Sequence, residues 1–478
     1  MFCSHQSNPC RDMAPLAVEQ FAMVLSAAFA CGILLASRRK VRRHLDSSFF
    51  FSEVAVKLPA DFAAWEQLAK NLATLNQQGS LRAALQGMPP LHVRDLSLPE
   101  LRRARVILGA LVSSYVNGHS VPWHCLEEVA QHSPSAPAQR FAYRAPSAPS
   151  ASPSPHPPVA SEQQAPVTLP LALATAWQET SSRLGMPPVV TATDLDLWNR
   201  AATPVSNVSP REGLTAFCQT VSLTGTESER AFHALPFALQ LVFSPLLPRL
   251  LTAPDCMEAR DAAAATDLCM GLKGAIDDAR ALLPWVYTGV DVAEFYDVYR
   301  PLLSGWGERG LRLPAVGSTP RSSQGGVSKG GVAARGAAGA DEEEVEIVSR
   351  HGGPSAGQTA IIMLIDMALG VNHGPQLQAF QHAMREYMPS EHRALLVEFA
   401  SRVARTGSLG DAAGAPTAPR ELVAAHAAAI ESLGEMRRYH YRIASHFLRP
   451  ALSGTGGSDF RSMLNEGVKS TLKTGKVR

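Results

Sequence analysis

Apolar residues recur every three or four positions along most of this 478-residue chain. This is the spacing of one face of an α-helix. Phe62, Trp65 and Leu68 show it in FAAWEQLAKNLATLNQQGSLRAAL, and LPELRRARVILGALVSSYVNG repeats it up to Asn117-Gly118, a pair typical of a helix end. No run of alternating apolar and polar residues predicts a strand convincingly. The predicted class is all-α.

The clearest helical patterns are SAGQTAIIMLIDMALG and RELVAAHAAAIESLGEMRRYHYRIASHFL. In the second, His440 lies on an apolar stripe with Leu433, Met436, Ile443 and Phe447. An imidazole that points from a helix into an apolar slot is one way in which a protein holds haem iron. A lone histidine on such a face is more often a core residue satisfied by a hydrogen bond, so the pattern alone leaves both interpretations open.

Two stretches interrupt the helical pattern and hold too few apolar groups to offset the entropy of ordering. Residues 133–166 are dense in proline, serine and alanine, and residues 317–346 are rich in glycine and alanine and end in the acidic run DEEEVE. We expect both to be disordered insertions, each of which can be a long surface loop. The predicted organisation is an N-terminal segment (1–48), a smaller helical domain (49–200) and a large helical domain (201–478).

Composition excludes some classes of protein. Lysine plus arginine (44) nearly balance aspartate plus glutamate (42), so no bulk charge indicates nucleic-acid binding. The seven cysteines include no CxxC pair and are odd in number, which favours neither a zinc site nor a disulfide framework. A reducing compartment fits best, with most thiols acting as small buried apolar groups.

The N-terminal segment contains an uncharged run at residues 21–36, FAMVLSAAFACGILLA, followed by the basic run SRRKVRR. Its 16 residues fall short of the ~20 that span a membrane, and extension back to residue 13 includes Glu19. Three alternatives remain: a membrane anchor through residues 13–36, an organelle-targeting segment, or an ordinary helix. We expect a cytoplasmic protein, tethered to the cytosolic face of a membrane if the segment is an anchor.

Six short motifs occur in a fixed order, whereas no nucleotide-binding loop, zinc signature or nucleophile elbow is found. The motifs are LGMPP (184–188), LLSGW (302–306), GGPSAGQ (352–358), MREYMPSEHR (384–393), RRYH (437–440) and GTGGSDF (454–460). Together they resemble the indoleamine 2,3-dioxygenase family, the haem enzymes that open the indole ring of tryptophan. The resemblance implies a small N-terminal helical domain and a large C-terminal helical bundle that encloses haem.

The resemblance implies haem b as the cofactor and His440 as the proximal iron ligand, with a partner on its other nitrogen. It also implies that Arg437 and Asp366 pair beside the haem. A buried carboxylate needs such a partner because its desolvation is costly. The alternatives are a satisfied core histidine and an Asp366 that points outward into solvent.

On the opposite side, the resemblance implies that Arg300 binds the substrate carboxylate, for which a planar guanidinium is suited. Phe295 matches an aromatic residue of the distal pocket, whose ring would pack on the indole. Its neighbour Tyr296 replaces the usual phenylalanine and adds a hydroxyl group. The alternative for Arg300 is a solvated charge at a helix end.

Ser355, Ala356 and Gly357 match a wall of small residues over the haem, where backbone approaches the ligand closely. Here Pro354 is inserted before Ser355, which we expect to shift that wall. Thr455 matches a C-terminal loop that closes over the substrate and excludes water.

The chain departs from the family on the distal wall. Leu235 stands where the family usually has a short polar or histidine side chain above the haem, and Ala231 replaces an aromatic residue. Ala192 and Leu195 stand where a tyrosine and a small residue line the pocket. His233 is near enough to substitute, but a helix places it on a different face from Leu235.

The implied reaction is cleavage of the indole C2–C3 bond of tryptophan to N-formylkynurenine, the first step of the kynurenine pathway. It requires dioxygen, ferrous iron and an electron donor, and no protein acid or base, because the cofactor carries the hard chemistry. Two alternatives remain: a non-catalytic haem or dioxygen binder of the same fold, favoured by the altered distal wall, and a membrane-tethered scaffold without haem. Which indoleamine or stereoisomer is preferred stays open, since the altered residues line that pocket.

Overall fold

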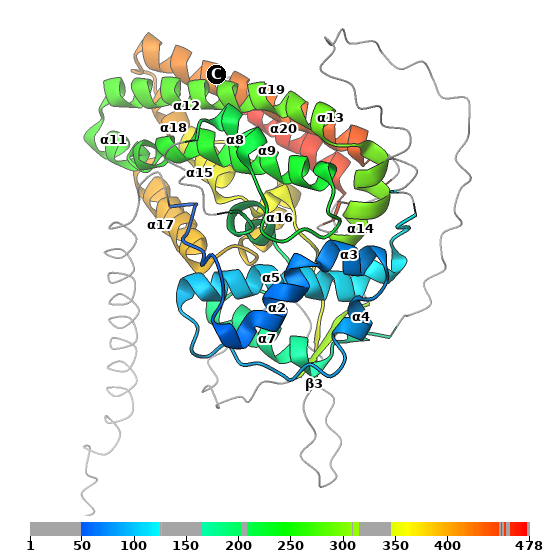
Figure 1. Ribbon diagram of the computed structural model, residues 1–478. Helices are drawn as coiled ribbons and strands as arrows, with labels where there is room; N and C mark the ends of the chain where they lie inside the picture. The colour runs from blue at the N-terminus through cyan, green and yellow to red at the C-terminus, as the bar shows by residue number, and fades with distance from the viewer. Residues whose placement is uncertain are drawn as a thin grey trace, which may run out of the picture.

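The computed structural model describes residues 49–124, 126, 165–201, 208–307, 309–314, 346–448, 451, 454–455 and 459–475. Most of these residues are helical, which confirms the all-α class (Figure 1). The apolar segment 13–36 and most of the two low-complexity stretches lie outside the described residues, so the predictions made for them are not tested. The division into two helical domains near residue 200 also stays a prediction.

The α-helices of four or more residues are α2 (Ala63–Lys70), α3 (Leu72–Gln77), α4 (Leu81–Ala84), α5 (Leu98–Asn117), α7 (Leu171–Leu184), α8 (Pro210–Ala216), α9 (Glu227–Phe243), α10 (Leu247–Leu250), α11 (Ala253–Ala259), α12 (Ala262–Leu282), α13 (Val286–Gly289), α15 (Ala360–Leu369), α16 (Pro375–Arg385), α17 (Ser390–Thr406), α18 (Leu409–Ala413), α19 (Arg420–Phe447) and α20 (Phe460–Thr474). The shorter turns used below are α14 (Arg300–Leu302), the 3-10 turn η8 (Ala356–Gln358) and two π-helical turns, η3 (Thr193–Trp198) and η7 (Glu294–Tyr299).

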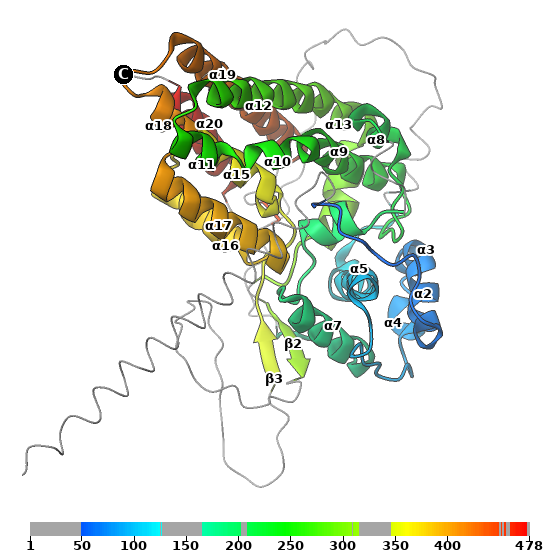
Figure 2. The same cartoon turned by 90° about the vertical axis from the view of Figure 1, so that its left-hand side faces the viewer.

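Helix α5 is the central helix of the N-terminal half and is buried on nearly every side. A capping box formed by Ser97 and Glu100 starts it, and it ends at Asn117 as predicted. Helices α2 and α7 pack against it (Figure 2). Its Arg105 is fully buried and donates to Asp194 at 2.8 Å, which satisfies a charge that would otherwise be costly to bury.

The C-terminal half is built on the 28-residue helix α19, which packs along α12 on one side and α20 on the other (Figure 1). Among the described residues, only the stretch Glu227–Ala259 is helical, long and apolar enough to cross a membrane. Most of its apolar window (67%) is buried inside the protein, and α9 packs on α8 and α12. This burial is typical of a core helix.

A small sheet was not predicted. Strands β1 (Val167–Thr168), β2 (Leu311–Pro314) and β3 (Glu346–Ser349) pair in that order, β1 parallel and β3 antiparallel to β2. The strands are only two to four residues long, too short for alternation to show. The chain enters β1 from the first low-complexity stretch and leaves β2 into the second, so both stretches join the fold at one sheet.

The motifs LLSGW and GGPSAGQ meet through two glycines. The backbone of Gly305 is left-handed, with φ at 67°. A Cβ atom on Gly353 would lie 1.8 Å from the carbonyl oxygen of Leu303. Trp306 N–H donates to the carbonyl of His351 at 2.9 Å, which holds the two backbones together. Glycine is therefore required where these segments touch.

We expect Gly353→Ala to lower the free energy of unfolding by about 3 kcal/mol, because backbone atoms must move to admit the methyl group. Gly274→Ala is the control, since Gly274 lies exposed within α12 with nothing within 4 Å of a Cβ. There the change should raise the free energy of unfolding by about 1 kcal/mol. Urea unfolding measures both, and equal effects would contradict the close packing.

His392 on α17 predicts a pH dependence of stability. The side chain is 3% exposed and its ring contacts Phe49 and Phe50. Burial lowers its pKa to about 4, although the Glu391 carboxylate acts in the opposite direction. Between the ordinary value of 6.5 and about 4, the unfolded chain binds a proton that the folded chain does not. The free energy of unfolding should therefore fall as pH falls through this window.

We expect His392→Phe to keep the ring contacts and to remove this part of the pH dependence. Urea unfolding at about pH 7.5 and about pH 5 measures it. His382→Gln, at an exposed position on α16, should keep the slope of the parent. A parent whose stability does not change over this range would show that His392 is not held neutral by burial.

Candidate active site

The carboxylate of Asp366, on α15, is buried within the C-terminal half and is 4% exposed. Arg437 Nη2 donates to its two oxygens at 2.6 and 2.7 Å. His373 Nε2 lies 3.0 Å from Oδ2, and Gln381 donates to the same oxygen at 3.4 Å. The structure thus brings the predicted pair together and excludes an Asp366 that points into solvent.

These contacts decide the charge of Asp366. Burial opposes ionisation, but the positive charge of Arg437 and the hydrogen bonds from His373 and Arg437 outweigh it, so the pKa of Asp366 lies below its ordinary value. Asp366 is therefore an anion at neutral pH and pairs with the Arg437 cation. The stability that it contributes is present above its ordinary pKa and is lost only as pH falls through the lower, folded-state pKa.

The C-terminal helix α20 joins this network, which the sequence did not predict. Arg437 Nη1 donates to Thr471, whose side chain is fully buried. Ser470 Oγ lies 2.7 Å from His373 Nδ1. His373 is therefore bonded through both nitrogens and connects the carboxylate to α20. The only signal in the sequence was a histidine shortly after Gly370, which ends α15.

His440 lies one turn after Arg437 on α19 and is half-buried. Three members of its predicted stripe, Leu433, Met436 and Phe447, are buried. Within the described part of the chain, no hydrogen bond to the His440 imidazole is found, so the partner predicted for its second nitrogen is not seen there, and the ring also differs from a satisfied core histidine such as His426. Burial and then the charge of Arg437 lower the pKa of His440, which favours the neutral ring that metal coordination needs.

These observations fit a haem. No group of three or more His, Cys, Asp or Glu side chains in the described ranges could hold a metal ion. A single histidine suits an iron whose other ligands come from a porphyrin, and His440 has a neutral nitrogen available for it. The ion pair one turn away is already satisfied and does not compete for the histidine.

An aromatic cluster faces the C-terminal end of α19. The ring centroid of Phe295, on η7, lies 4.8 Å from that of Phe232, on α9, and 6.3 Å from that of Tyr299. It also lies 5.7 Å from the ring of Phe447, two turns after His440 on the same helix. The structure therefore places the predicted indole contact against the helix that carries the predicted iron ligand.

Arg300 follows this cluster directly. Its guanidinium carbon lies 5.3 Å from the ring centroid of Tyr296, which is within cation–π distance. Burial lowers the pKa of Arg300, although the Tyr296 phenol acts in the opposite direction. The Tyr296 ring packs in turn on Ala444 and Phe460 at the end of α19 and the start of α20. Arg300 is half-buried, in contrast to the solvated charge that was the alternative.

The predicted small-residue wall is the turn η8. Ser355 caps it by accepting from Gly357 N at 3.2 Å, and Ala356 is exposed. A Cβ on Gly357 would lie 2.6 Å from the ring of Phe380, so glycine makes room for that ring. The inserted Pro354 adds a contact next to this turn, because its carbonyl accepts a hydrogen bond from Thr455 Oγ1 at 2.6 Å.

A second hydrogen bond completes this contact. Gly353 N donates to the carbonyl of Thr455 at 3.0 Å. The carbonyl and the hydroxyl of Thr455 are thus both bonded to the GGPSAGQ segment.

The altered distal residues are packed into the core. Ala192, Leu195, Ala231 and Leu235 are each at most 8% exposed. The indole N–H of Trp285 donates to the Ala231 carbonyl at 3.1 Å. His233, which the helix was expected to place on a different face from Leu235, is bonded through its two ring nitrogens to Asp196 and Tyr299. Sequence reasoning missed both partners, since nothing in their spacing connects them.

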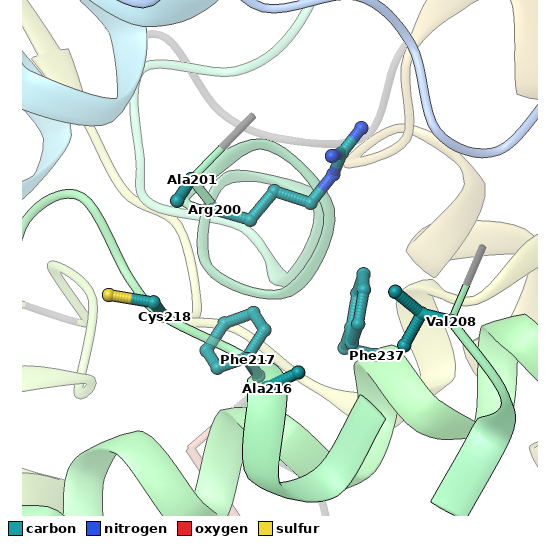
Figure 3. Close-up of a pocket in the computed structure, with 7 residues that line it drawn as sticks. All are labelled: Arg200, Ala201, Val208, Ala216, Phe217, Cys218 and Phe237. Carbon is teal, nitrogen blue, oxygen red and sulfur yellow. The ribbon is translucent and has the colours of Figure 1, made fainter. Parts of the chain in front are cut away.

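A small cavity lies apart from these residues, beside α8 and α9 (Figure 3). Its volume of about 10 Å³ holds at most one water molecule and is too small for an indole. Its lining residues are Arg200, Ala201, Val208, Ala216, Phe217, Cys218 and Phe237.

Comparisons with known proteins cover most of the chain. The sequence model of the family described as Indoleamine 2,3-dioxygenase matches residues 44–451. The chain is 26% identical over 406 residues to the 6-hydroxytryptophan 2,3-dioxygenase of Fusarium equiseti, covering 84% of this chain and 82% of that protein. It is 26% identical over 440 residues to indoleamine 2,3-dioxygenase 2 of Mus musculus (87% and 90% covered) and 22% identical over 457 residues to indoleamine 2,3-dioxygenase 1 of Rattus norvegicus (90% and 93%).

We expect Arg437→Ala to lower the free energy of unfolding by about 4 kcal/mol, because it leaves the buried Asp366 carboxylate without its cation. The neighbouring Arg438→Ala is the matched control. Arg438 is 50% exposed and pairs with Glu435 on the surface, so its loss should change stability by less than about 1 kcal/mol. Urea unfolding compares the two variants. Equal losses would show that the buried pair contributes no more than a surface pair.

Proposed function

The chain belongs to the indoleamine 2,3-dioxygenase family, and on this premise we propose that it is a haem-dependent dioxygenase. The proposed reaction cleaves the C2–C3 bond of the indole ring of tryptophan with dioxygen and gives N-formylkynurenine. The observation that carries the proposal is the neutral, half-buried His440 one turn from a buried Arg437–Asp366 pair.

His440 would hold the iron of haem b from the proximal side. Its lowered pKa leaves the ring nitrogen unprotonated, which coordination requires. When bound, ferrous haem supplies the activation of dioxygen and needs an electron donor to stay ferrous. The ion pair fixes α19 against α15, so the histidine is carried on a helix that cannot rotate without breaking a buried ion pair.

Arg300 would bind the substrate carboxylate. Its position above the Tyr296 ring limits the orientations of the guanidinium, which reduces the entropy lost when a carboxylate binds. Phe295, held by Phe232 and Phe447, would offer its ring to the indole. An amino-acid carboxylate and an aromatic ring held at two fixed points define the position of the indole ring.

Thr455 would close the site. Its two hydrogen bonds, to Gly353 and Pro354, hold Thr455 against the segment that leads into the η8 turn. A residue held there would help to exclude water from the reacting oxygen and indole.

The substrate within the class is part of the proposal. The similar proteins carry names for different indoles, 6-hydroxytryptophan for one and indoleamines for others. The pocket residues that would separate these substrates are the altered ones, Ala192, Leu195, Ala231 and Leu235. We propose L-tryptophan as the first substrate to test because the carboxylate and indole contacts are both present.

Location is a separate proposal and rests on the sequence alone. We propose a cytoplasmic enzyme that the basic-flanked segment 13–36 can tether to the cytosolic face of a membrane. Fractionation of cells that express the full chain, with and without residues 13–36, tests it. Loss of the membrane-bound fraction on deletion supports the anchor.

The reaction is tested with the full chain, loaded with haem and reduced. We expect it to convert L-tryptophan and dioxygen to N-formylkynurenine, detected by mass spectrometry, and His440→Ala to give none. His446→Ala is the control, because His446 is exposed two turns further along the same helix and should leave turnover unchanged. A haem spectrum without product would favour a non-catalytic haem binder, and the absence of haem would contradict both functions.

A further inference from the structure

One histidine connects the two π-helical turns of the distal wall. His233, on α9, is 2% exposed. Its Nδ1 lies 2.6 Å from Oδ1 of Asp196, on η3, and its Nε2 is hydrogen-bonded to the hydroxyl of Tyr299, on η7. The three residues are far apart in the sequence and come from three different elements. π-Helical turns are rare and often lie at functional sites.

Every polar group in this chain of contacts has a partner. The phenol of Tyr299 is fully buried, and burial together with the carboxylates of Glu229 and Asp196 raises its pKa well above the ordinary value, so the phenol keeps its proton. Its hydroxyl and both ring nitrogens of His233 are satisfied by the contacts with each other and with Asp196.

Each end of the chain of contacts is one residue away from a predicted site residue. Tyr299 directly precedes Arg300, and its ring contacts Phe232 at 6.0 Å and Phe295 at 6.3 Å. Asp196 directly follows Leu195, one of the altered residues of the wall. A displacement of the Tyr299 hydroxyl or of the Asp196 carboxylate would move the backbone that carries Arg300 or Leu195.

We propose that Asp196, His233 and Tyr299 form a positioning relay that fixes η3 and η7 relative to each other and so places Arg300 and Phe295 for the substrate. The proposal rests on the proposed function for the identity of the substrate. The relay residues themselves are positioning residues, since each acts through Arg300, Phe295 or Leu195.

The test uses Tyr299→Phe in the haem-loaded full chain. This change removes only the hydroxyl and keeps the ring in the aromatic cluster. We expect the KM for L-tryptophan to rise about tenfold, and the Kd for L-tryptophan, measured from the shift of the haem Soret band, to rise equally. The kcat should stay within about twofold of the parent value. His233→Leu and Asp196→Asn should act in the same direction. The double variant His233→Leu/Tyr299→Phe should cost no more than the worse single variant, because both remove one unit.

Two controls separate positioning from stability. Tyr115→Phe removes a hydroxyl from α5, where the Tyr115 ring packs under Arg82 and, among the described residues, does not contact the relay; it should leave KM and Kd unchanged. Leu81→Ala opens a cavity in α4 and should lower the midpoint of urea unfolding without raising KM. If Leu81→Ala weakens tryptophan binding as much as Tyr299→Phe does, the relay is structural only and the proposal fails.

The remaining outcomes are also decisive. Unchanged KM and Kd in all three single variants, or additive effects in the double variant, would overturn the relay. A parent that binds haem but neither binds nor converts L-tryptophan would contradict the proposed function instead. In that case, the midpoints of urea unfolding of Asp196→Asn, Tyr299→Phe and the double variant still test the relay. A shift in the double variant that is smaller than the sum of the two single shifts supports the relay, whereas additive shifts overturn it.

Discussion

The buried carboxylate of Asp366 is the point on which the C-terminal half of the protein depends. An anion at this depth is stable only if cations and hydrogen-bond donors surround it. Arg437 supplies the charge from α19, His373 supplies a second contact from the loop after α15, and Thr471 and Ser470 extend both contacts to α20. Helices α15, α19 and α20 are thereby fixed around one ion pair.

This ion pair affects both the position and the pKa of His440. The histidine lies one turn from Arg437 on α19. The ion pair restricts both the rotation of this helix about its axis and its shift along that axis. The same positive charge, added to burial, keeps the imidazole neutral. The aromatic cluster reaches the same helix through the contact between Phe295 and Phe447. One long helix thus connects the predicted iron ligand with the predicted indole contact.

The distal side is held by a different kind of interaction. There hydrogen bonds join Tyr299, His233 and Asp196 and connect two short π-helical turns. Hydrogen bonds of this kind restrict the relative orientation of the groups that they join. The protein therefore has an ion pair beside the predicted iron ligand and a hydrogen-bonded chain beside the predicted substrate contacts.

The sequence predicted the features that repeat or that stand in short motifs. Helical periodicity predicted α5 and its end at Asn117, and the family resemblance carried by the motifs implied the Arg437–Asp366 pair that the structure contains. The helical periodicity of residues 62–85 is divided among the three helices α2, α3 and α4, with Gly79 at φ 64° between the last two. Glycine favours that left-handed conformation, and periodicity does not reveal it.

Contacts between distant residues were beyond sequence reasoning. Asp196, His233 and Tyr299 are joined only in three dimensions, and none of them stands in a motif. The strands β1 to β3 are too short to alternate visibly, and Ser470 and Thr471 lie on a helix after the last motif. Each of these features depends on packing partners rather than on local preference.

The most direct test of the central claim is a crystal structure of the haem-loaded protein with an anomalous difference map recorded at the iron absorption edge. The account predicts one iron peak within bonding distance of a ring nitrogen of His440, with the Arg437–Asp366 pair intact beside it. An iron peak at another histidine, or a haem bound with His440 turned away from it, would contradict the account.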